Sequence, residues 1–535
     1  MRMQGWLGLA MTGCLVGCGV EPEGPSPLAQ VQAQVCAPGS AQEVKQVIPP
    51  DHVPGGWLNE EPRPRWMTDV AGTLFFAVDL ERGTTLWKSD GTTAGTIPLL
   101  TLPAPDTGER RIQNLTAVGT RLFFEVYDPA KGLTLWVSDG TATGTLQVKD
   151  LSACDDFSAQ YGFQALDGAL SFVHEPCGAG HVELWGSDGT EAGTVRVQDF
   201  GNETMISGDA RTFSARVLFV HQDGVGPRLW RTDGTAAGTI QLRTFGTQSR
   251  VVRTLEVSGA ALFIVQDPTT GTTLWRTDGT AEGTRLLKRL DASSTVVLEN
   301  QHVVGGTAVF AFYDAGPSTE VWKTDGTESG TVRLDTFGTE ARLLGIAGPY
   351  AILVTRSADQ QHQELRRLSL SGGGKELVAV LDNPFADEST GVGLQGVIRT
   401  GDRIFLSQVI SSMEPTNEQV SLWVTDGTAA GTRELAGGLS TSKVAQPPLF
   451  DTGTGTVLFV NRVGWSGLEP WVTDGTLAGT QPIADIQEGP GSSHPLEFQR
   501  VGNRVFFNAM PTVRAFSLWS VPAALSCSAG NPVAR

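Results

Sequence analysis

The sequence has few positive charges, few cysteines and hardly any helical periodicity. Its 39 lysines and arginines are outnumbered by 57 aspartates and glutamates, which gives a net charge of -18. A field of that sign repels phosphate backbones, and no Lys/Arg cluster reverses it locally, so we expect no nucleic-acid partner. Because 65 glycines and 29 prolines separate short β-branched and aromatic runs, we expect an all-β fold.

Familiar catalytic and metal-binding motifs are missing as well. The chain has no GxSxG elbow, HExxH helix, P-loop or EF-hand loop. His174, Cys177 and His181 share a short spacing, but a fourth metal ligand is not evident, and Cys177 has a better partner in Cys154. We therefore predict no metal, no cofactor and no catalysis.

Adjacent like charges offer two weaker candidates for chemistry. Asp155 and Asp156 could in principle serve glycoside hydrolysis, and Arg110 with Arg111 could contact an acidic sugar. Neighbouring charges in a loop are usually solvated. We interpret both pairs as surface charge.

The N-terminus resembles a bacterial lipoprotein signal. Arg2 is followed by the apolar run WLGLAMTGCLV, which is too short to span a bilayer as a mature helix. The stretch LVGC, residues 15–18, resembles a lipobox, and this resemblance implies that residues 1–17 are removed and that Cys18 carries the lipid anchor. Residues 18–35 then form a flexible tether, and the protein is expected in the bacterial cell envelope, anchored to the outer membrane on a side that the sequence leaves open. The alternative is a plain signal peptide.

One short motif recurs along most of the chain. LWVSDGTATGT, residues 135–145, has close copies whose tryptophans stand 45 to 49 residues apart, with one double step of 101 residues. The tryptophans are Trp87, Trp136, Trp185, Trp230, Trp275, Trp322, Trp423, Trp471 and Trp519. Gly-containing turns followed by apolar runs form a second signature, and both signatures give ten units.

Each unit has the pattern of a β-propeller blade. Unit two contains four strand-length runs, RIQNLTAVG, RLFFEVYD, LTLWVSDG and GTLQVKDL, separated by turn residues. Four antiparallel strands per repeat of this length are typical of a blade, whose faces must be covered by its neighbours. The Leu-Trp dipeptide on the third strand is expected to fill the blade core. We predict a propeller over residues 36–535, as one ten-unit ring or, alternatively, two smaller propellers.

The ring needs a closing strand, because the last unit stops after its third. The segment QEVKQVIPP, residues 42–50, resembles a fourth strand and its turn, so we expect it to complete the last blade. Four cysteines remain after the signal, and an oxidising envelope allows three pairings among them. Their positions favour Cys36 with Cys527, which would staple the ring, and Cys154 with Cys177; the alternative is four free thiols.

The DGT segment is expected to be a turn between the third and fourth strands. Its Asp can accept backbone N–H bonds, and its Gly allows positive φ. A calcium loop would need several converging carboxylates where this motif provides one. The turn-forming aspartates are Asp90, Asp139, Asp188, Asp233, Asp278, Asp325, Asp426 and Asp474.

The repeat resembles a bacterial family named for its motif, the ELWxxDGT-repeat proteins. The match covers most of residues 66–520; eight units keep DGTxxGT, whereas only VELW at 182 keeps the Glu of ELW. The family is typically exported, so the resemblance implies architecture and location more than chemistry. Regular turns are expected on one face of the ring and irregular loops on the other.

The favoured interpretation is a lipid-anchored, non-catalytic binding or scaffolding protein. It would take a protein or glycan ligand on the irregular-loop face, because loops on rigid scaffolds carry recognition. The alternatives are a surface carbohydrate-active hydrolase and a periplasmic envelope-assembly factor. The ligand and the oligomeric state stay open.

Overall fold

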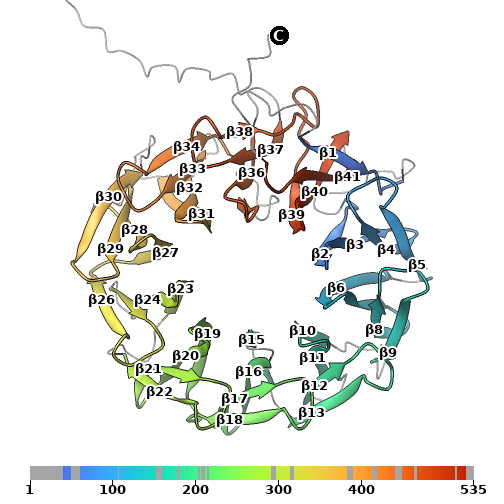
Figure 1. Cartoon of the computed structure of the whole chain (residues 1–535), viewed down its shortest axis with the longest axis horizontal. Helices are drawn as coiled ribbons and strands as arrows, with labels where there is room; N and C mark the ends of the chain where they lie inside the picture. Colours follow the sequence, from blue (N-terminus) through green and yellow to red (C-terminus); the bar gives the residue numbers. More distant parts are fainter. Residues whose placement is uncertain are drawn as a thin grey trace, which may run out of the picture.

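The chain forms a single ring of ten β-sheets, shown by the computed structural model in Figure 1. The structure describes residues 40–525 except 50–60, 107, 152–158, 177–180, 203–204, 207–210, 214–215, 291–296, 314–317, 359, 382, 384–389, 413–418, 440–448, 463–466 and 513–514. Within these limits every regular element is a strand, and no helix is long and apolar enough to cross a membrane. The predicted ten-bladed propeller is confirmed, and the alternative of two smaller propellers is wrong.

Each blade is an antiparallel sheet, and in blades 1 to 9 the strands follow one another in chain order from the inside of the ring to its outside. The strands of blades 1 to 3 are β2 (Arg65–Val70), β3 (Thr73–Leu80), β4 (Gly83–Ser89), β5 (Ile97–Pro103); β6 (Arg111–Val118), β7 (Arg121–Asp128), β8 (Gly132–Ser138), β9 (Thr145–Asp150); β10 (Ala159–Ala165), β11 (Leu170–Glu175), β12 (His181–Ser187) and β13 (Val195–Asn202).

Blade 4 splits its inner strand into two pieces that both pair with β16. The strands of blades 4 to 6 are β14 (Met205–Ile206), β15 (Arg211–Phe213), β16 (Arg216–Asp223), β17 (Gly226–Thr232), β18 (Ile240–Thr244); β19 (Arg250–Val257), β20 (Ala260–Asp267), β21 (Gly271–Thr277), β22 (Arg285–Arg289); β23 (Val297–Val304), β24 (Thr307–Tyr313), β25 (Thr319–Thr324) and β26 (Val332–Phe337).

The remaining blades continue the same order. Blades 7 to 10 contain β27 (Ala341–Ala347), β28 (Tyr350–Arg356), β29 (Gln363–Ser369), β30 (Lys375–Leu381); β31 (Thr390–Thr400), β32 (Arg403–Ser412), β33 (Gln419–Thr425), β34 (Arg433–Gly437); β35 (Leu449–Asp451), β36 (Val457–Arg462), β37 (Leu468–Thr473), β38 (Gln481–Pro482); β39 (Leu496–Val501), β40 (Arg504–Thr512) and β41 (Ala515–Pro522).

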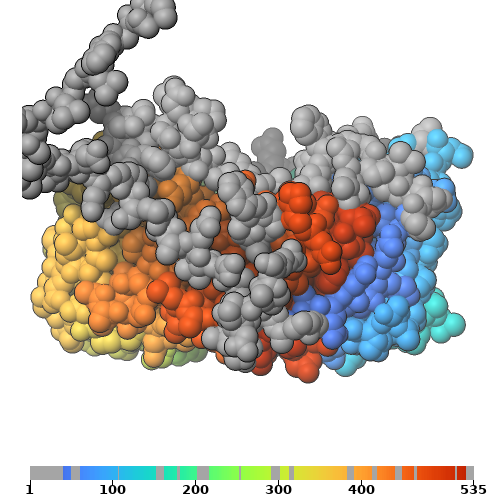
Figure 2. All heavy atoms as spheres, turned by 90° about the horizontal axis from the view of Figure 1, so that it is seen from above, coloured from blue at the N-terminus to red at the C-terminus, as the bar shows by residue number. Residues whose placement is uncertain are grey.

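The N-terminal strand closes the ring, as predicted. β1 (Gln42–Lys45) pairs antiparallel with β41, with Gln42 opposite Ser520 and Glu43 opposite Trp519. It supplies the outermost strand of blade 10, so this sheet has the order β1-β41-β40-β39. Figure 2 shows the ring from its edge, with the blue first blade beside the red last blade.

A buried apolar cluster lies at each junction between consecutive blades in the described part of the chain. The cluster between blades 1 and 2, for example, joins Phe75 and Leu86 to Leu122 and Phe124, and the cluster between blades 10 and 1 includes Val44 of β1. A large apolar side chain contributes roughly 1.5–3 kcal/mol when it is removed from water. The core is therefore mainly a circle of interfaces shared by neighbouring blades; a small cluster of Leu496, Met510 and Phe516 lies within blade 10 alone.

Candidate functional site

The nine repeat tryptophans lie on the third strands, at the blade junctions. Each one belongs to or packs against the cluster between its own blade and the preceding one. Most stack on the phenylalanine directly opposite in the second strand, as Phe124 does on Trp136 with ring centroids 6.0 Å apart. Trp322, Trp423 and Trp471 are buried and the other six are half-buried. In blade 7 this position holds Arg366, opposite Leu353.

The residue two positions before the tryptophan accepts its indole N–H in several blades. Glu183 accepts from Trp185 at 2.8 Å and Glu320 from Trp322 at 2.9 Å, while Thr134 does the same for Trp136. A glutamate also stands at this position at 364 and 469, so four units keep it and the sequence analysis undercounted it. In blades 3 and 6 the Glu of the motif is thus a partner for the indole, whereas in blade 9 the Trp471 Nε1 has no partner among the described residues.

The DGT segment folds into the same hydrogen-bonded turn in all eight units that carry it. In blade 5 an Asp278 oxygen accepts the backbone N–H of Thr280 at 2.9 Å and its hydroxyl at 2.7 Å, and the same hydroxyl oxygen accepts the N–H of Gly283 at 2.9 Å. These bonds lower the pKa of Asp278. A Cβ added at Gly283 would stand 2.0 Å from an Asp278 oxygen. The turn therefore needs its second glycine for space.

The flanking hydroxyls lock the base of this turn. Thr277 and Thr284 are buried, and their hydroxyls lie 2.8 Å apart, with equivalent Ser/Thr pairs in the other seven units. The Thr284 hydroxyl also donates to the Thr280 carbonyl at 2.6 Å. Every conserved-looking position of the motif is thus used inside the turn, and its aspartates are structural groups.

Several predicted positions lie outside the described residues. These are Cys18, Cys36, Cys154, Cys177, Cys527, Asp155 and Asp156. The lipid anchor and both disulfides therefore stay predictions. Of the paired arginines, Arg110 binds Asp128 and the Pro103 carbonyl, and Arg111 binds Glu109.

Three neighbouring inner strands share a strained bulge. In β39, β2 and β6 the pairing register shifts around one residue with left-handed backbone: Glu497 (φ 56°), Trp66 (φ 60°) and Asn114 (φ 55°). A bulky residue in this region is an outlier that costs on the order of 1–3 kcal/mol. Such backbone outliers gather at functional sites, so the inner wall of blades 10, 1 and 2 is a candidate functional site.

Charged side chains surround two of these bulges where the inner strands begin, on the irregular-loop face. We name this group the mouth cluster; it comprises Arg63, Arg65, Trp66, Asp79, Arg111 and Glu497. The Arg63 Nε lies 3.1 Å from a Glu497 oxygen, and Asn508 of blade 10 donates to the Pro64 carbonyl at 2.7 Å, which fixes this segment against the last blade. Arg65 lies within electrostatic range of the other four charged members.

The acids of the mouth cluster have environments that favour their protonated forms. Burial raises the pKa of Asp79, although the Thr84 hydroxyl donates to it at 2.6 Å, and burial raises the pKa of Glu497, although Arg63 opposes this. Burial and the neighbouring Arg63 lower the pKa of Arg65. Both acids are only half-buried, and the adjacent Trp66 is 47% exposed. The group therefore combines reachable carboxyls, arginines and an open aromatic face.

Glu125 supports the neighbouring bulge from below. It is fully buried and accepts hydrogen bonds from Asn114 at 2.6 Å and Gln113 at 3.2 Å. Burial raises its pKa to about 7. Through these bonds Glu125 holds the left-handed Asn114 in place, and its other carboxylate oxygen has no partner among the described residues.

Sequence reasoning missed the mouth cluster because its members are far apart in the chain. Arg63 and Glu497 are separated by 434 positions and meet only because the ring closes. One signal was available: Trp66 stands on a first strand, outside the register of the repeat tryptophans.

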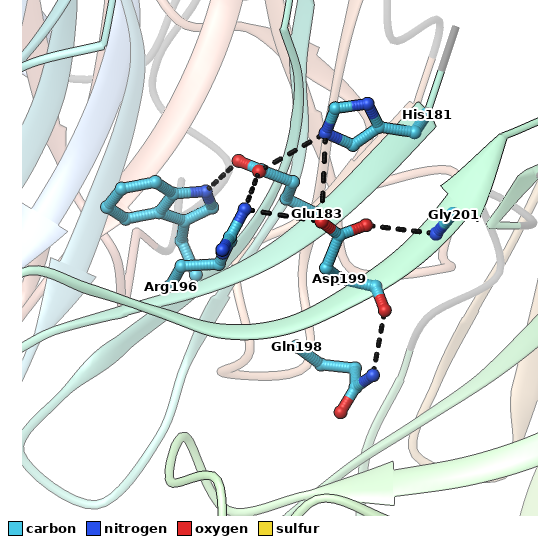
Figure 3. Close-up of polar contacts among 7 residues, drawn as sticks. His181, Glu183, Arg196, Gln198, Asp199 and Gly201 are labelled. Atoms are coloured by element: carbon cyan, nitrogen blue, oxygen red, sulfur yellow. Dashed lines mark hydrogen bonds and ion pairs between the residues drawn. The ribbon is translucent and has the colours of Figure 1, made fainter. Parts of the chain in front are cut away.

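A second polar group lies on the outer strands of blade 3 (Figure 3). His181 Nε2 is 3.3 Å from a Glu183 oxygen and 4.0 Å from an Asp199 oxygen. Arg196 Nη1 donates to Glu183 at 2.7 Å and to Asp199 at 3.2 Å. Of the predicted His174–Cys177–His181 trio, His174 and His181 both lie beside Glu183, and Cys177 is outside the described residues.

Comparison with solved structures finds propeller-containing hydrolases. Oligopeptidase B from Leishmania major is 10% identical with a TM-score of 0.38, over 66% of this chain and 54% of that one. A prolyl endopeptidase (12%, 0.36, 67% and 56%) and puromycin hydrolase (16%, 0.32, 66% and 59%) are also similar. The chain thus spans just over half the length of these proteins. No family profile matches it, and no curated protein resembles it in sequence.

These neighbours contradict the prediction of a non-catalytic binding or scaffolding protein, because the solved structures that resemble the chain are those of enzymes. The prediction rested on missing linear motifs. A site assembled across a ring closure has no linear motif, so that reasoning could not exclude an enzyme. At these identities the likeness extends to the fold and leaves the substrate open.

Proposed function

We propose that the protein is a carbohydrate-active hydrolase whose substrate binds at the mouth cluster. The observation that carries the proposal is the exposed, left-handed Trp66 next to Arg65, whose charge interacts with two half-buried carboxyls of raised pKa, Asp79 and Glu497. A flat indole offers an apolar face to a sugar ring, and paired carboxyls are the groups that glycoside hydrolysis uses.

Each member has a chemical role in this proposal. Asp79, whose pKa is raised by burial, gives its proton to the departing glycosidic oxygen. Glu497, oriented by Arg63, accepts the proton of the water that adds to the anomeric carbon. Arg65 and Arg111 supply positive charge for a carboxylate or sulfate on the sugar. The favoured substrate is therefore an acidic glycan.

The test is turnover by the purified full-length chain on neutral glycosides, uronate-containing or sulfated glycosides, and peptides. We expect release of reducing sugar from acidic glycans, a drop in kcat of about 10²–10⁴-fold in Asp79→Asn, and a raised KM in Trp66→Ala. Asp267→Asn is the matched control, because Asp267 ends the second strand of blade 5, across the ring. Cleavage of peptides alone, or of nothing, would overturn the proposal.

The proposal also includes the protein's cellular location and the family to which its repeat belongs. The LVGC stretch supports a lipid anchor on Cys18 in the bacterial envelope, and the eight DGTxxGT turns support a place among the ELWxxDGT-repeat proteins. An anchored ring would meet polymeric glycans at the cell surface or in the periplasm.

A further inference from the structure

The outer strands of blade 3 place four potential metal ligands on one face of the sheet. Glu183 of β12 stands directly opposite His174 of β11 and Asp199 of β13, so the three side chains form a row across the sheet. His181 lies two residues before Glu183 and so shares this face. One ligand atom each of His181, Glu183 and Asp199 lie within 4.8 Å of one another.

His174 adds an independent observation. Its side chain is 3% exposed, and its Nδ1 is buried without a hydrogen-bond partner among the described residues. An imidazole nitrogen left in this way costs free energy unless a ligand completes it.

Arg196 binds both acids of the group. It bridges the Glu183 and Asp199 carboxylates, and its side chain is 51% exposed (Figure 3). A long exposed arginine can turn into solvent and leave both carboxylates to a cation. The guanidinium therefore balances the charge of the acids until an ion takes its place.

We propose that His181, Glu183 and Asp199 bind one divalent transition-metal ion, of which Zn²⁺ fits best, that the ion displaces Arg196, and that the buried ring of His174, opposite Glu183, shifts to complete the coordination. Two imidazoles with two carboxylates are a donor set that Zn²⁺ and Co²⁺ accept. The site lies on the outer strands of blade 3, away from the mouth cluster, so it is independent of the proposed hydrolase.

Blade 6 provides an internal control. Glu320 there accepts the indole N–H of Trp322 and binds Arg333 at 3.0 Å, as Glu183 does with its own partners. The positions of His181 and Asp199 are taken by Ser318 and Thr336. Blade 6 thus keeps the structural Glu–Arg pair and lacks the extra ligands.

The experiment is a titration of the full-length chain with Co²⁺ and Zn²⁺, followed by calorimetry and by the visible absorption of bound Co²⁺. We expect one ion per chain at this site, affinity reduced by more than about 10-fold in Glu183→Gln and His181→Asn, and no change in Glu320→Gln. Arg196→Gln should tighten binding by up to about fivefold, because a competing cation is gone.

Two results would overturn the site. One is unchanged Co²⁺ affinity and absorption in both Glu183→Gln and His181→Asn; the other is an equal loss in Glu320→Gln. Melting curves recorded in EDTA identify a variant that fails to fold. The His181 side chain is partly exposed, so we expect His181→Asn to fold. Its Co²⁺ affinity then tests the site even if Glu183→Gln does not fold.

Discussion

Replacing Gly283 by alanine tests the hydrogen-bond network of the DGT turn. The new Cβ would stand 2.0 Å from the Asp278 carboxylate, which must therefore rotate away and give up its two bonds to Thr280. At a net value of roughly 1 kcal/mol for each bond in an exposed turn, the loss is about 2 kcal/mol. Glu282→Ala, an exposed change in the same turn, should stay within about 0.5 kcal/mol.

The size of the chain decides the assay. Unfolding 535 residues as one unit carries an entropy of about 1 kcal/mol/K, so a loss of about 2 kcal/mol lowers the Tm by only about 2 °C. Hydrogen exchange of the turn amides is far more sensitive, because the same loss raises local opening by about 30-fold. Amides of residues 278–284 should exchange faster in Gly283→Ala and not in Glu282→Ala.

The pH dependence gives a second readout with a definite sign. The pKa of Asp278 is lowered in the folded turn by its bonds to Thr280, so its stabilisation is present above the ordinary aspartate pKa, near about 4, and is lost as the pH falls through the folded value. The difference between the two chains should shrink below that range. Equal exchange in both chains at neutral pH would refute the reasoning.

Three further predictions concern the ring, its buried acid and its anchor. Val44→Asp puts a charge into the closing junction and should cost more than about 3 kcal/mol, seen as a lower urea midpoint, whereas Glu43→Ala on the exposed side of β1 should not. Burial raises the pKa of Glu469 from 4.5 to about 7, so its contribution is complete at acid pH and is lost as the pH rises through about 7; Glu469→Gln should flatten that decline in pH-dependent melting. Cys18→Ser should abolish incorporation of labelled fatty acid, and label retained in that variant would place the anchor elsewhere.

The repeat made most of the architecture predictable. Ten units, four strands each and a fourth strand supplied by residues 42–45 follow from the spacing of two signatures and the missing end of the last unit. The role of the DGT aspartates follows from one carboxylate beside one glycine. The DGT turn depends on neighbours within about ten positions, and the closing strand is visible because the last unit lacks its fourth strand.

The candidate sites depend on contacts that a linear sequence hides. Arg63 contacts Glu497 only because the ring closes. The left-handed backbone of Trp66 lies in a β-bulge, and no Gly, Asn or Asp at this position predicts it from the sequence. Strand register aligns three residues of blade 3: His174, Glu183 and Asp199. The repeat predicts the strands, but the spacing of these residues in the sequence does not show that they stand opposite one another. Asp199 was not evident as a ligand near His181 because it lies on the next strand, where only strand pairing brings it opposite Glu183.

The short pairing of β1 with β41 makes blade 10 mechanically different from the other nine blades. In those blades the chain itself links all the strands, whereas β1 is held to the rest of blade 10 by strand pairing; towards blade 1 it adds the buried Val44 and the contacts of Lys45 and Val44 with the first DGT turn, at 2.7 Å and 2.9 Å. Any tension applied through the chain before Gln42 reaches this seam first. In a ring tethered by its N-terminus, the pulling force would therefore act directly on the short pairing of β1 with β41.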